Sequence, residues 1–159
     1  QPDDGTIALA NNKTLAYMPQ EVVLQSSKTI LQETFSAHTK IDKLQQTVQQ
    51  LEPIIEKQKD TADQKIIDRY IAAQEQLAEL NAEKTLAQTK KVLMGLGFSE
   101  KRFDQPVDSL SVGWKMRIVL AKLLLQKSDC YLFDEPTNHL DIVAKDWFIN
   151  FLKMQSSDL

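Results

Sequence analysis

Two adjacent carboxylates, Asp134 and Glu135, follow the apolar run at residues 130–133, whose sequence is CYLF. An apolar run without polar alternation predicts a strand that is buried on both faces of a parallel sheet. Ligands bind beyond the carboxyl ends of such strands, which would place both acids at a site. There Asp134 could hold Mg²⁺ against phosphate oxygens, while Glu135 orients or deprotonates an attacking water. The alternative is structural, because acidic residues also favour the N-terminus of a helix.

A second candidate site precedes these acids, in the segment LSVGW at residues 110–114. The small residues Ser111 and Gly113 would let backbone N–H groups approach an anion closely. A helix that starts at this point directs the positive end of its dipole toward the same anion, which suits a terminal phosphate. The alternative is that Ser111 only caps a helix whose first turn contains a glycine.

Three strings in the chain resemble motifs of ATP-binding cassette (ABC) proteins. Residues 134–141, DEPTNHLD, are similar to the Walker B motif and D-loop in the wording of the soluble ABC-F family. Residues 110–117, LSVGWKMR, resemble the ABC signature, and residues 17–20, YMPQ, resemble the strand and glutamine of the Q-loop. Because the order and spacing of the strings agree with a cassette along nearly the whole chain, the sequence resembles the ABC-F family.

The resemblance implies roles for the residues of this cassette's own ATP site. Glu135 would be the general base, and Gln20 would contact both the metal and the attacking water. Asp134 and Gln20 would therefore hold Mg²⁺, and Asp134 would also belong to the nucleotide-binding site. Without the resemblance, Gln20 is only a polar residue at the end of a strand.

The resemblance also implies half of a second ATP site. Ser111 and Gly113 would reach across an interface to nucleotide held by the second ABC cassette of the same protein. Asp141, in the D-loop, would lie in the nucleotide-binding region as well. Val112 stands where the family usually has a second glycine. A Cβ at that position narrows the allowed backbone conformations and the room for phosphate.

The loop that would grip the nucleotide is absent from these residues. The sequence contains no G-x-x-x-x-G-K-[ST] string and only four glycines in all, although that loop supplies the amides and lysine that cradle phosphates. His139 is expected to be a turn or interface residue rather than the γ-phosphate switch, and His38 is expected to be exposed. We therefore expect an internal fragment of a first cassette that lacks Walker A and the histidine switch. On its own, it should be inactive and should bind neither ATP nor Mg²⁺ tightly.

The expected fold is α/β but mostly helical, as a fragment of a P-loop ABC ATPase core with an inserted antiparallel α-helical hairpin. Strands are predicted at residues 6–10, 14–18 and 130–133. Three regions are expected: partial core strands with the Q-loop at 1–21, a helical subdomain with a hairpin arm at 22–98, and the signature helix, Walker B strand, D-loop and following helix at 99–159. A strand without its usual neighbours exposes an edge, through which the fragment would self-associate.

Two apolar stripes at helical spacing predict the hairpin. The first runs through Ile41, Leu44, Val48, Leu51 and Ile55, and the second through Ile66, Tyr70, Ala73, Leu77 and Leu80. Residues 61–64, TADQ, resemble a capping box that opens the second helix, which should run to a stop at Gly95 and Gly97. Pro53 should kink the first helix or mark a new helix start.

The hairpin resembles the arm of the first cassette in ABC-F proteins, which reaches toward the ribosomal peptidyl-transfer centre and bound tRNA. Its tip, residues 57–65, has charges of both signs. Binding to the ribosome and tRNA is therefore implied by the resemblance and not by a basic patch. The alternative is a plain helical subdomain that only packs on the ATPase core.

The composition fits a globular protein of the reducing cytoplasm. The chain is 42% apolar and 26% charged, which is ordinary, and its net charge of −3 gives no general attraction to nucleic acid. No apolar run approaches the roughly 18 residues that would indicate a membrane segment. The lone Cys130 cannot form an intrachain disulfide, as expected for a cytoplasmic protein.

Three functions remain open from the sequence. In the first, the chain belongs to a soluble twin-cassette ABC-F ATPase that acts on ribosomes. In the second, it belongs to the ATP-binding subunit of an ABC transporter, although the TNHLD wording and the long hairpin argue against this. In the third, it is a helical interaction module whose nucleotide-binding residues are vestigial, a reading that Val112 weakly encourages.

Overall fold

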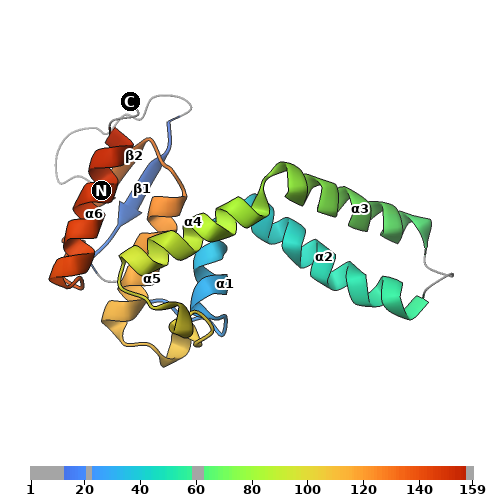
Figure 1. Cartoon of the computed structure of the whole chain (residues 1–159), viewed down its shortest axis with the longest axis horizontal. Helices are drawn as coiled ribbons and strands as arrows, with labels where there is room; N and C mark the ends of the chain where they lie inside the picture. The colour runs from blue at the N-terminus through green and yellow to red at the C-terminus, as the bar shows by residue number, and fades with distance from the viewer. Residues whose placement is uncertain (1–12, 21–22, 59–62, 157–159) are drawn as a thin grey trace, which may run out of the picture.

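The computed structural model describes residues 13–20, 23–58 and 63–156, and most of this part of the chain is helical. Its strands form a two-stranded parallel sheet, β1 (Leu15–Met18) and β2 (Cys130–Phe133). Its helices are α1 (Ile30–Phe35), α2 (Thr39–Gln58), α3 (Gln64–Glu79), α4 (Ala82–Gly95), α5 (Val112–Leu125) and α6 (Ile142–Ser156), with short 3₁₀ helices η2 (Glu100–Arg102) and η3 (Val107–Ser109) (Figure 1). The strand predicted at residues 6–10 lies outside the described residues.

One face of the sheet is open. The register pairs Leu15 with Cys130 and Tyr17 with Leu132, so these four side chains lie on the same face. Leu15, Tyr17 and Leu132 are 44%, 55% and 48% exposed, and Cys130 is exposed as well. The prediction that the 130–133 strand is buried on both faces is therefore wrong, because the helices that pack on the sheet cover only the opposite face.

The covered face joins the sheet to the helices. Ala16 and Met18 of β1 are buried, and Met18 belongs to the main hydrophobic core. On β2, the ring of Phe133 meets Phe148 of α6 edge-on, with 5.5 Å between the ring centroids. Alternation of buried and exposed residues along β1 is the period of a strand with one face on the core.

Asp129 holds the two strands together at the end where both begin. Its carboxylate accepts hydrogen bonds from the Thr14 amide and hydroxyl at 2.9 and 2.8 Å and from the Lys13 ammonium at 2.8 Å. The hydrogen bond from Lys13, followed by those from Thr14, holds the pKa of Asp129 well below its usual range. The ionised carboxylate is thus the form that fits this corner of the fold.

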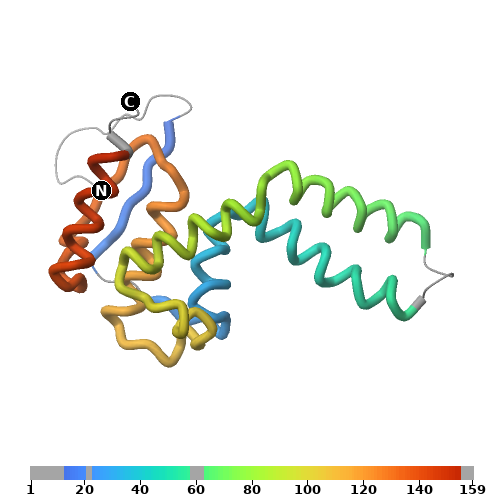
Figure 2. The backbone as a smooth tube through the Cα atoms, in the orientation of Figure 1, coloured from blue at the N-terminus to red at the C-terminus, as the bar shows by residue number. Residues whose placement is uncertain are grey.

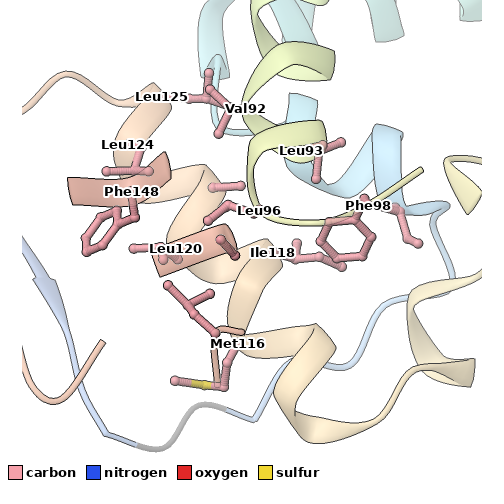
Figure 3. Packing of buried hydrophobic residues seen from close by; sticks show 14 of the residues in the cluster. Val92, Leu93, Leu96, Phe98, Met116, Ile118, Leu120, Leu124, Leu125 and Phe148 are labelled. Carbon is pink, nitrogen blue, oxygen red and sulfur yellow. The ribbon is translucent and has the colours of Figure 1, made fainter. Parts of the chain in front are cut away.

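α5 is the central helix of the core. Ile118, Leu120 and Leu124 on this helix are 0%, 1% and 1% exposed. They pack with Leu93 and Leu96 at the end of α4 and with residues of α1 and α6 (Figure 3). A helix that is apolar around most of its circumference is expected at the centre of a helical layer, where neighbours cover several of its faces.

α2 and α3 project from this body and lie side by side, running in opposite directions (Figure 2). α2 has 20 residues and so spans roughly 30 Å at 1.5 Å per residue. Pro53 lies inside α2 and does not start a new helix. α3 is capped by Asp63, whose carboxylate accepts from the Lys65 amide at 3.0 Å, so the cap lies at a later residue than the TADQ pattern predicts.

The second helix does not run unbroken to Gly95. It is divided at Asn81, whose φ of 50° is left-handed, and α4 then turns back onto α1 and α5. Asparagine adopts this conformation more readily than most residues. Gly97, at φ 91°, ends α4 as expected for a left-handed C-terminal residue. Gly95 has a different role: a Cβ there would lie only 1.9 Å from the Trp147 ring of α6.

His38 is half-buried, so the prediction that it is exposed is wrong. It lies at the corner between α1 and α2, and its Nε2 is 3.3 Å from the Thr89 hydroxyl of α4. The Thr89 hydroxyl donates to the Thr85 carbonyl and can therefore accept from His38 Nε2–H. Burial lowers the pKa of His38, and the nearby Lys127 adds to this effect.

Candidate functional site

The two adjacent acids lie directly after β2. The Asp134 amide donates to the Met18 carbonyl at 3.0 Å, which extends the pairing of β1 and β2 by one step. The Asp134 carboxylate is exposed and accepts no hydrogen bond from the described residues. Glu135 has a φ of 46° although it precedes Pro136, a combination that stores roughly 1–3 kcal/mol of backbone strain.

Gln20 and Glu135 meet side chain to side chain. The Gln20 amide nitrogen Nε2 donates to Glu135 Oε2 at 3.1 Å. The Asn138 amide donates to the same oxygen at 2.6 Å, and the Asn138 backbone N–H donates to the Glu135 carbonyl. Glu135 Oε1 accepts no hydrogen bond from the described part of the chain. Two amides therefore fix the carboxylate and leave one oxygen available for a water.

The sequence did not assign Asn138 to this site. Its side-chain amide nitrogen donates a hydrogen bond to the Glu135 carboxylate. The signal that could have indicated this contact is the spacing of three residues between an acid and an amide across a proline-initiated turn. Asn138 thus belongs with Gln20 and Glu135 as a third member of the cluster.

A cavity separates the start of α5 from the turn that follows β2. It has a volume of about 340 Å³ and is lined by Ser111, Gly113, Trp114, Arg117, Asn138, His139, Leu140 and Asp141. The structure thus brings Ser111, Gly113 and Asp141 to one cavity, while Gln20, Asp134 and Glu135 lie at the end of the strands. Asn138 belongs to both groups, because it lines the cavity and also binds Glu135.

Neither helix capping nor side-chain packing explains why serine and glycine occupy positions 111 and 113. Ser111 occupies the N-cap position of α5, but its side chain makes no capping hydrogen bond. A Cβ on Gly113 would lie 3.6 Å from Nδ1 of His139, an ordinary van der Waals separation, so packing does not require glycine there. The alternative reading of Ser111 as a simple capping residue therefore lacks its hydrogen bond. The side chain of Val112, between these two residues, is 64% exposed.

Arg117 supports the cavity, although no pattern in the sequence indicated a role for it. It is 8% exposed, and its guanidinium donates to the carbonyls of His139 and Leu96 at 2.8 and 2.9 Å and to Asp141 Oδ2 at 3.1 Å. The guanidinium also lies 4.4 Å from the centre of the Trp114 ring. Arg117 therefore ties the end of α4 and the turn after β2 to the first turns of α5.

Asp141 is occupied by contacts within the chain. Its Oδ1 accepts from the Ala144 amide at 2.9 Å in the first turn of α6, and its Oδ2 accepts from Arg117. The Ala144 N–H, with a smaller contribution from Arg117, holds the pKa of Asp141 below its usual range. A direct bond from Asp141 to nucleotide would compete with these partners, so Asp141 contributes to the cavity by shaping its wall.

The order and contacts of these segments agree with a known family. The family model described as ABC transporter matches residues 1–138. The chain belongs to the ABC transporter family. The resemblance of the chain to an ABC cassette is thereby confirmed.

Its relatives include members of the F subfamily. The chain is 32% identical to ABC transporter F family member 5 from Arabidopsis thaliana over 158 residues, which is 98% of this chain and 23% of that protein. It is 42% identical to human ATP-binding cassette sub-family F member 3 over 83 residues, 52% of this chain and 12% of that protein. It is 48% identical to elongation factor 3B from Saccharomyces cerevisiae over 60 residues, 38% of this chain and 6% of that protein. The chain thus spans about a quarter or less of these relatives.

Membrane-spanning helices and metal-ligating clusters are both absent from the part of the chain that the structure describes. None of the helices there combines the length and the apolar character needed to cross a membrane. No group of three or more His, Cys, Asp or Glu side chains there is arranged to hold a metal ion. A Mg²⁺ ion beside Asp134 would therefore depend on ligands from water and phosphate, which is the usual coordination of Mg²⁺ at nucleotides.

Proposed function

We propose that the chain carries parts of two ATP sites of an ABC-F ATPase. The observation that carries this proposal is the hydrogen bond between Gln20 and Glu135, because it joins residues 115 positions apart in sequence whose surrounding strings resemble a Q-loop and a Walker B motif. Glu135 is the general base for ATP held by this cassette. Its free Oε1 accepts the proton of the attacking water, while Gln20 and Asn138 keep Oε2 in place.

The residues present fit a Mg²⁺ ion. The Asp134 carboxylate is exposed and has no partner among the described residues. Gln20 uses its amide nitrogen on Glu135, which leaves its amide oxygen for a cation. Mg²⁺ prefers oxygen ligands, and at nucleotide sites it takes only one or two of them from the protein and the rest from phosphate and water. When bound, the ion would neutralise charge on the phosphates of ATP. The chain's own contribution is to hold Asp134 and Gln20 at the same end of β1 and β2.

The cavity at the start of α5 belongs to the second ATP site. Ser111 and Gly113 present a free hydroxyl and an unobstructed backbone at a helix N-terminus, which suits the γ-phosphate of nucleotide held by a second cassette of the same protein. Asp141 and Arg117 shape the cavity wall. The phosphate-gripping loop is absent from the sequence, so this chain alone should not hydrolyse ATP.

The projecting helices α2 and α3 are the arm through which the protein acts on ribosomes and tRNA. Their length, their packing on each other and the similarity of the chain to ABC-F proteins and to elongation factor 3B support this role. Because the arm carries both Lys57 and Glu56 near its end, contact with RNA depends on shape and a few cations rather than on a basic patch. The corresponding localisation is cytoplasmic.

A second candidate, the ATP-binding subunit of an ABC transporter, is favoured by the description of the matched family. In that case the helices near the Q-loop would dock on a membrane partner, and the projection of α2 and α3 would have no evident use. Cosedimentation with ribosomes separates the two candidates, since only the ABC-F proposal requires ATP-dependent association.

The catalytic part of the proposal is tested by Glu135→Gln in a protein that carries both cassettes. Loss of the general base should reduce ATP turnover by about 10²–10⁴-fold while ATP still binds. Glu100→Gln, at an exposed glutamate of η2, is the matched control and should leave turnover unchanged. Normal turnover in Glu135→Gln would refute the assignment of the base. Failure of the ATP-trapped variant to sediment with ribosomes would refute the ribosomal role.

A further inference from the structure

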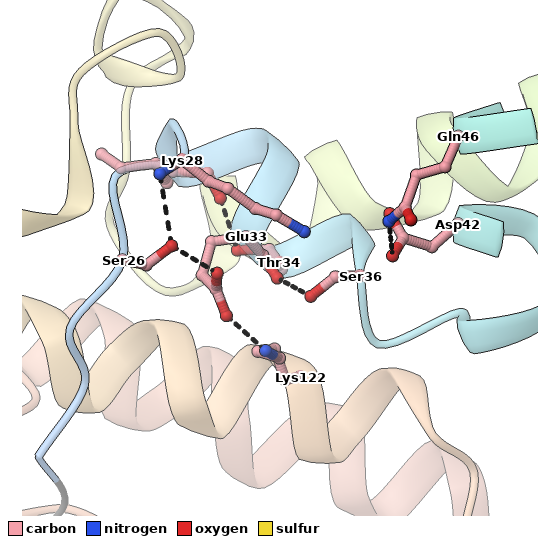
Figure 4. Close-up of polar contacts among 9 residues, drawn as sticks. Ser26, Lys28, Glu33, Thr34, Ser36, Asp42, Gln46 and Lys122 are labelled. Atoms are coloured by element: carbon pink, nitrogen blue, oxygen red, sulfur yellow. Dashed lines mark hydrogen bonds and ion pairs between the residues drawn. The ribbon is translucent and has the colours of Figure 1, made fainter. Parts of the chain in front are cut away.

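A buried carboxylate on α1, Glu33, connects three separate segments of the chain (Figure 4). Glu33 is 7% exposed. One of its oxygens accepts from the Ser26 hydroxyl at 2.8 Å, and the other pairs with the Lys122 ammonium of α5. The Ser26 oxygen in turn accepts from the Lys28 amide at 3.2 Å, so the hydroxyl both donates and accepts a hydrogen bond. Neither oxygen of Glu33 is left without a partner.

The segments joined by Glu33 lead to the two ATP half-sites. Ser26 lies six residues after Gln20, in the stretch that runs from the Q-loop to α1. Lys122 lies on α5, the helix that begins directly after Ser111. A single ion pair with one additional hydrogen bond thus ties the segment after Gln20 to the helix that carries the signature at its start.

Hydrogen bonds outside the Glu33 cluster hold the same two regions together. The Val107 amide donates to the Lys28 carbonyl and the Ile30 amide to the Gln105 carbonyl, both at 3.0 Å. The Ser26 amide also donates to the Asp108 carboxylate at 2.9 Å. Residues 105–108 lie just before the string at residues 110–117, so residues 26–30 run along the segment that leads into the signature.

The chemistry of this cluster suits positioning better than stability. Burying an ion pair costs desolvation, and well-packed apolar residues at such places are often as stabilising. An ion pair and a hydroxyl bond are directional, however, whereas apolar contacts permit sliding. Lys122 and Ser26 can both reach Glu33 only when α5 and the segment after Gln20 have one relative register.

We propose that Glu33 is a positioning residue that holds the Q-loop segment and the signature helix in one register. The position of Gln20 in this cassette's ATP site and that of Ser111 in the second site are then set together. This inference rests on the proposed ATPase function. Glu33 touches neither nucleotide nor water in this scheme, and its effect passes through Ser26 and Lys122.

The test is Glu33→Gln in the two-cassette protein, with steady-state ATPase and equilibrium nucleotide binding measured in parallel. The variant keeps the shape of the side chain but loses the charge that pairs with Lys122. Misplacement of Gln20 and Ser111 should reduce kcat about tenfold or more, while the affinity for ATP and the number of binding sites stay within about twofold. Glu100→Gln is the control and should match the wild type in each measurement.

Two variants of Ser26 make the test independent of the folding of Glu33→Gln. Ser26→Ala removes the hydroxyl and should reduce kcat in the same direction, whereas Ser26→Thr keeps it and should restore most of the turnover. Unchanged kcat in both Glu33→Gln and Ser26→Ala would overturn the inference. A parallel fall of kcat and of the number of binding sites would also overturn it, because that result indicates only lost structure. If Glu135→Gln retained normal turnover, the proposed function would fail first and the inference with it.

Discussion

The close approach of Gly95 to Trp147 predicts whether Gly95→Ala stabilises or destabilises the chain. Helix propensity and packing predict opposite signs for this change in the free energy of unfolding. As a helix residue, Gly95 replaced by alanine should gain up to about 1 kcal/mol from helix propensity. The structure indicates the opposite. An alanine Cβ would lie 1.9, 2.2 and 2.4 Å from Cε2, Cδ2 and Nε1 of the Trp147 ring.

The size of the effect follows from these distances. Carbon atoms in contact are about 3.5–4.0 Å apart, so the ring must move by roughly 1.5 Å or α4 must separate from α6. Trp147 also stacks on Phe151, with 5.1 Å between centroids, so the ring cannot move alone. Overpacking of this kind costs about 1–3 kcal/mol. A ring displacement of roughly 1.5 Å belongs to the upper part of this range, about 2–3 kcal/mol. After subtraction of a propensity gain of about 1 kcal/mol, Gly95→Ala should lower the free energy of unfolding by about 1–2 kcal/mol.

Urea denaturation of the chain, followed by circular dichroism, measures this change. Gly113→Ala is the matched control, since its Cβ meets only an ordinary contact at 3.6 Å and should not destabilise the chain. In a Trp147→Leu background, Gly95→Ala should cost at least about 1 kcal/mol less, because the two positions are coupled through direct contact. A Gly95→Ala chain as stable as the wild type would refute the packing argument, as would equal costs in both backgrounds.

Three further outcomes follow from other contacts. Because the folded-state pKa of Asp129 is depressed, its contribution to stability is present above the ordinary pKa of 3.8 and is lost as the pH falls below that value. Asp129→Asn should therefore flatten the fall of Tm between pH 5 and pH 2. An unchanged acid profile would contradict this. Arg117→Lys keeps the charge, but one ammonium group cannot donate to two carbonyls and to Asp141 in the same geometry. The substitution should lower the free energy of unfolding, measured in urea, by about 2–4 kcal/mol. A loss under about 0.5 kcal/mol would contradict the role of the guanidinium group. The open sheet face should promote self-association, so light scattering should show a size that falls on dilution, and Leu132→Lys should shift the chain toward monomer; a strict monomer at all concentrations would count against it.

The sequence predicted those features that depend on residue order. The apolar runs located β1 and β2, and the stripes beginning at Ile41 and Ile66 located α2 and α3. The motif order placed Gln20 and Glu135 in one site, where the structure has them in contact. The strands and helices follow from local sequence, and the shared site follows from a family pattern. Predicting them does not require knowledge of how distant segments pack.

What the sequence did not predict depends on single backbone angles and on tertiary neighbours. The apolar stripe continues through Leu80, so periodicity gave no indication that Asn81 would adopt a left-handed conformation and divide the helix. The role of Arg117 depends on carbonyls of residues 96 and 139, which no local pattern brings together. The burial of Cys130 was overestimated because an apolar run does not report how many faces of its sheet are covered.

The attachment of α2 and α3 to the body has a mechanical consequence. The pair joins the rest of the chain at two short corners, the residues after α1 and the Leu80–Asn81 break (Figure 1). A rigid projection of roughly 30 Å that turns by about 10° at such corners carries its far end through roughly 5 Å, nearly the pitch of one helical turn. Rotations of α2 and α3 that are too small to disturb the core would therefore produce a larger displacement at the far end of the pair. The contact between His38 and Thr89 lies near the point about which the pair would pivot.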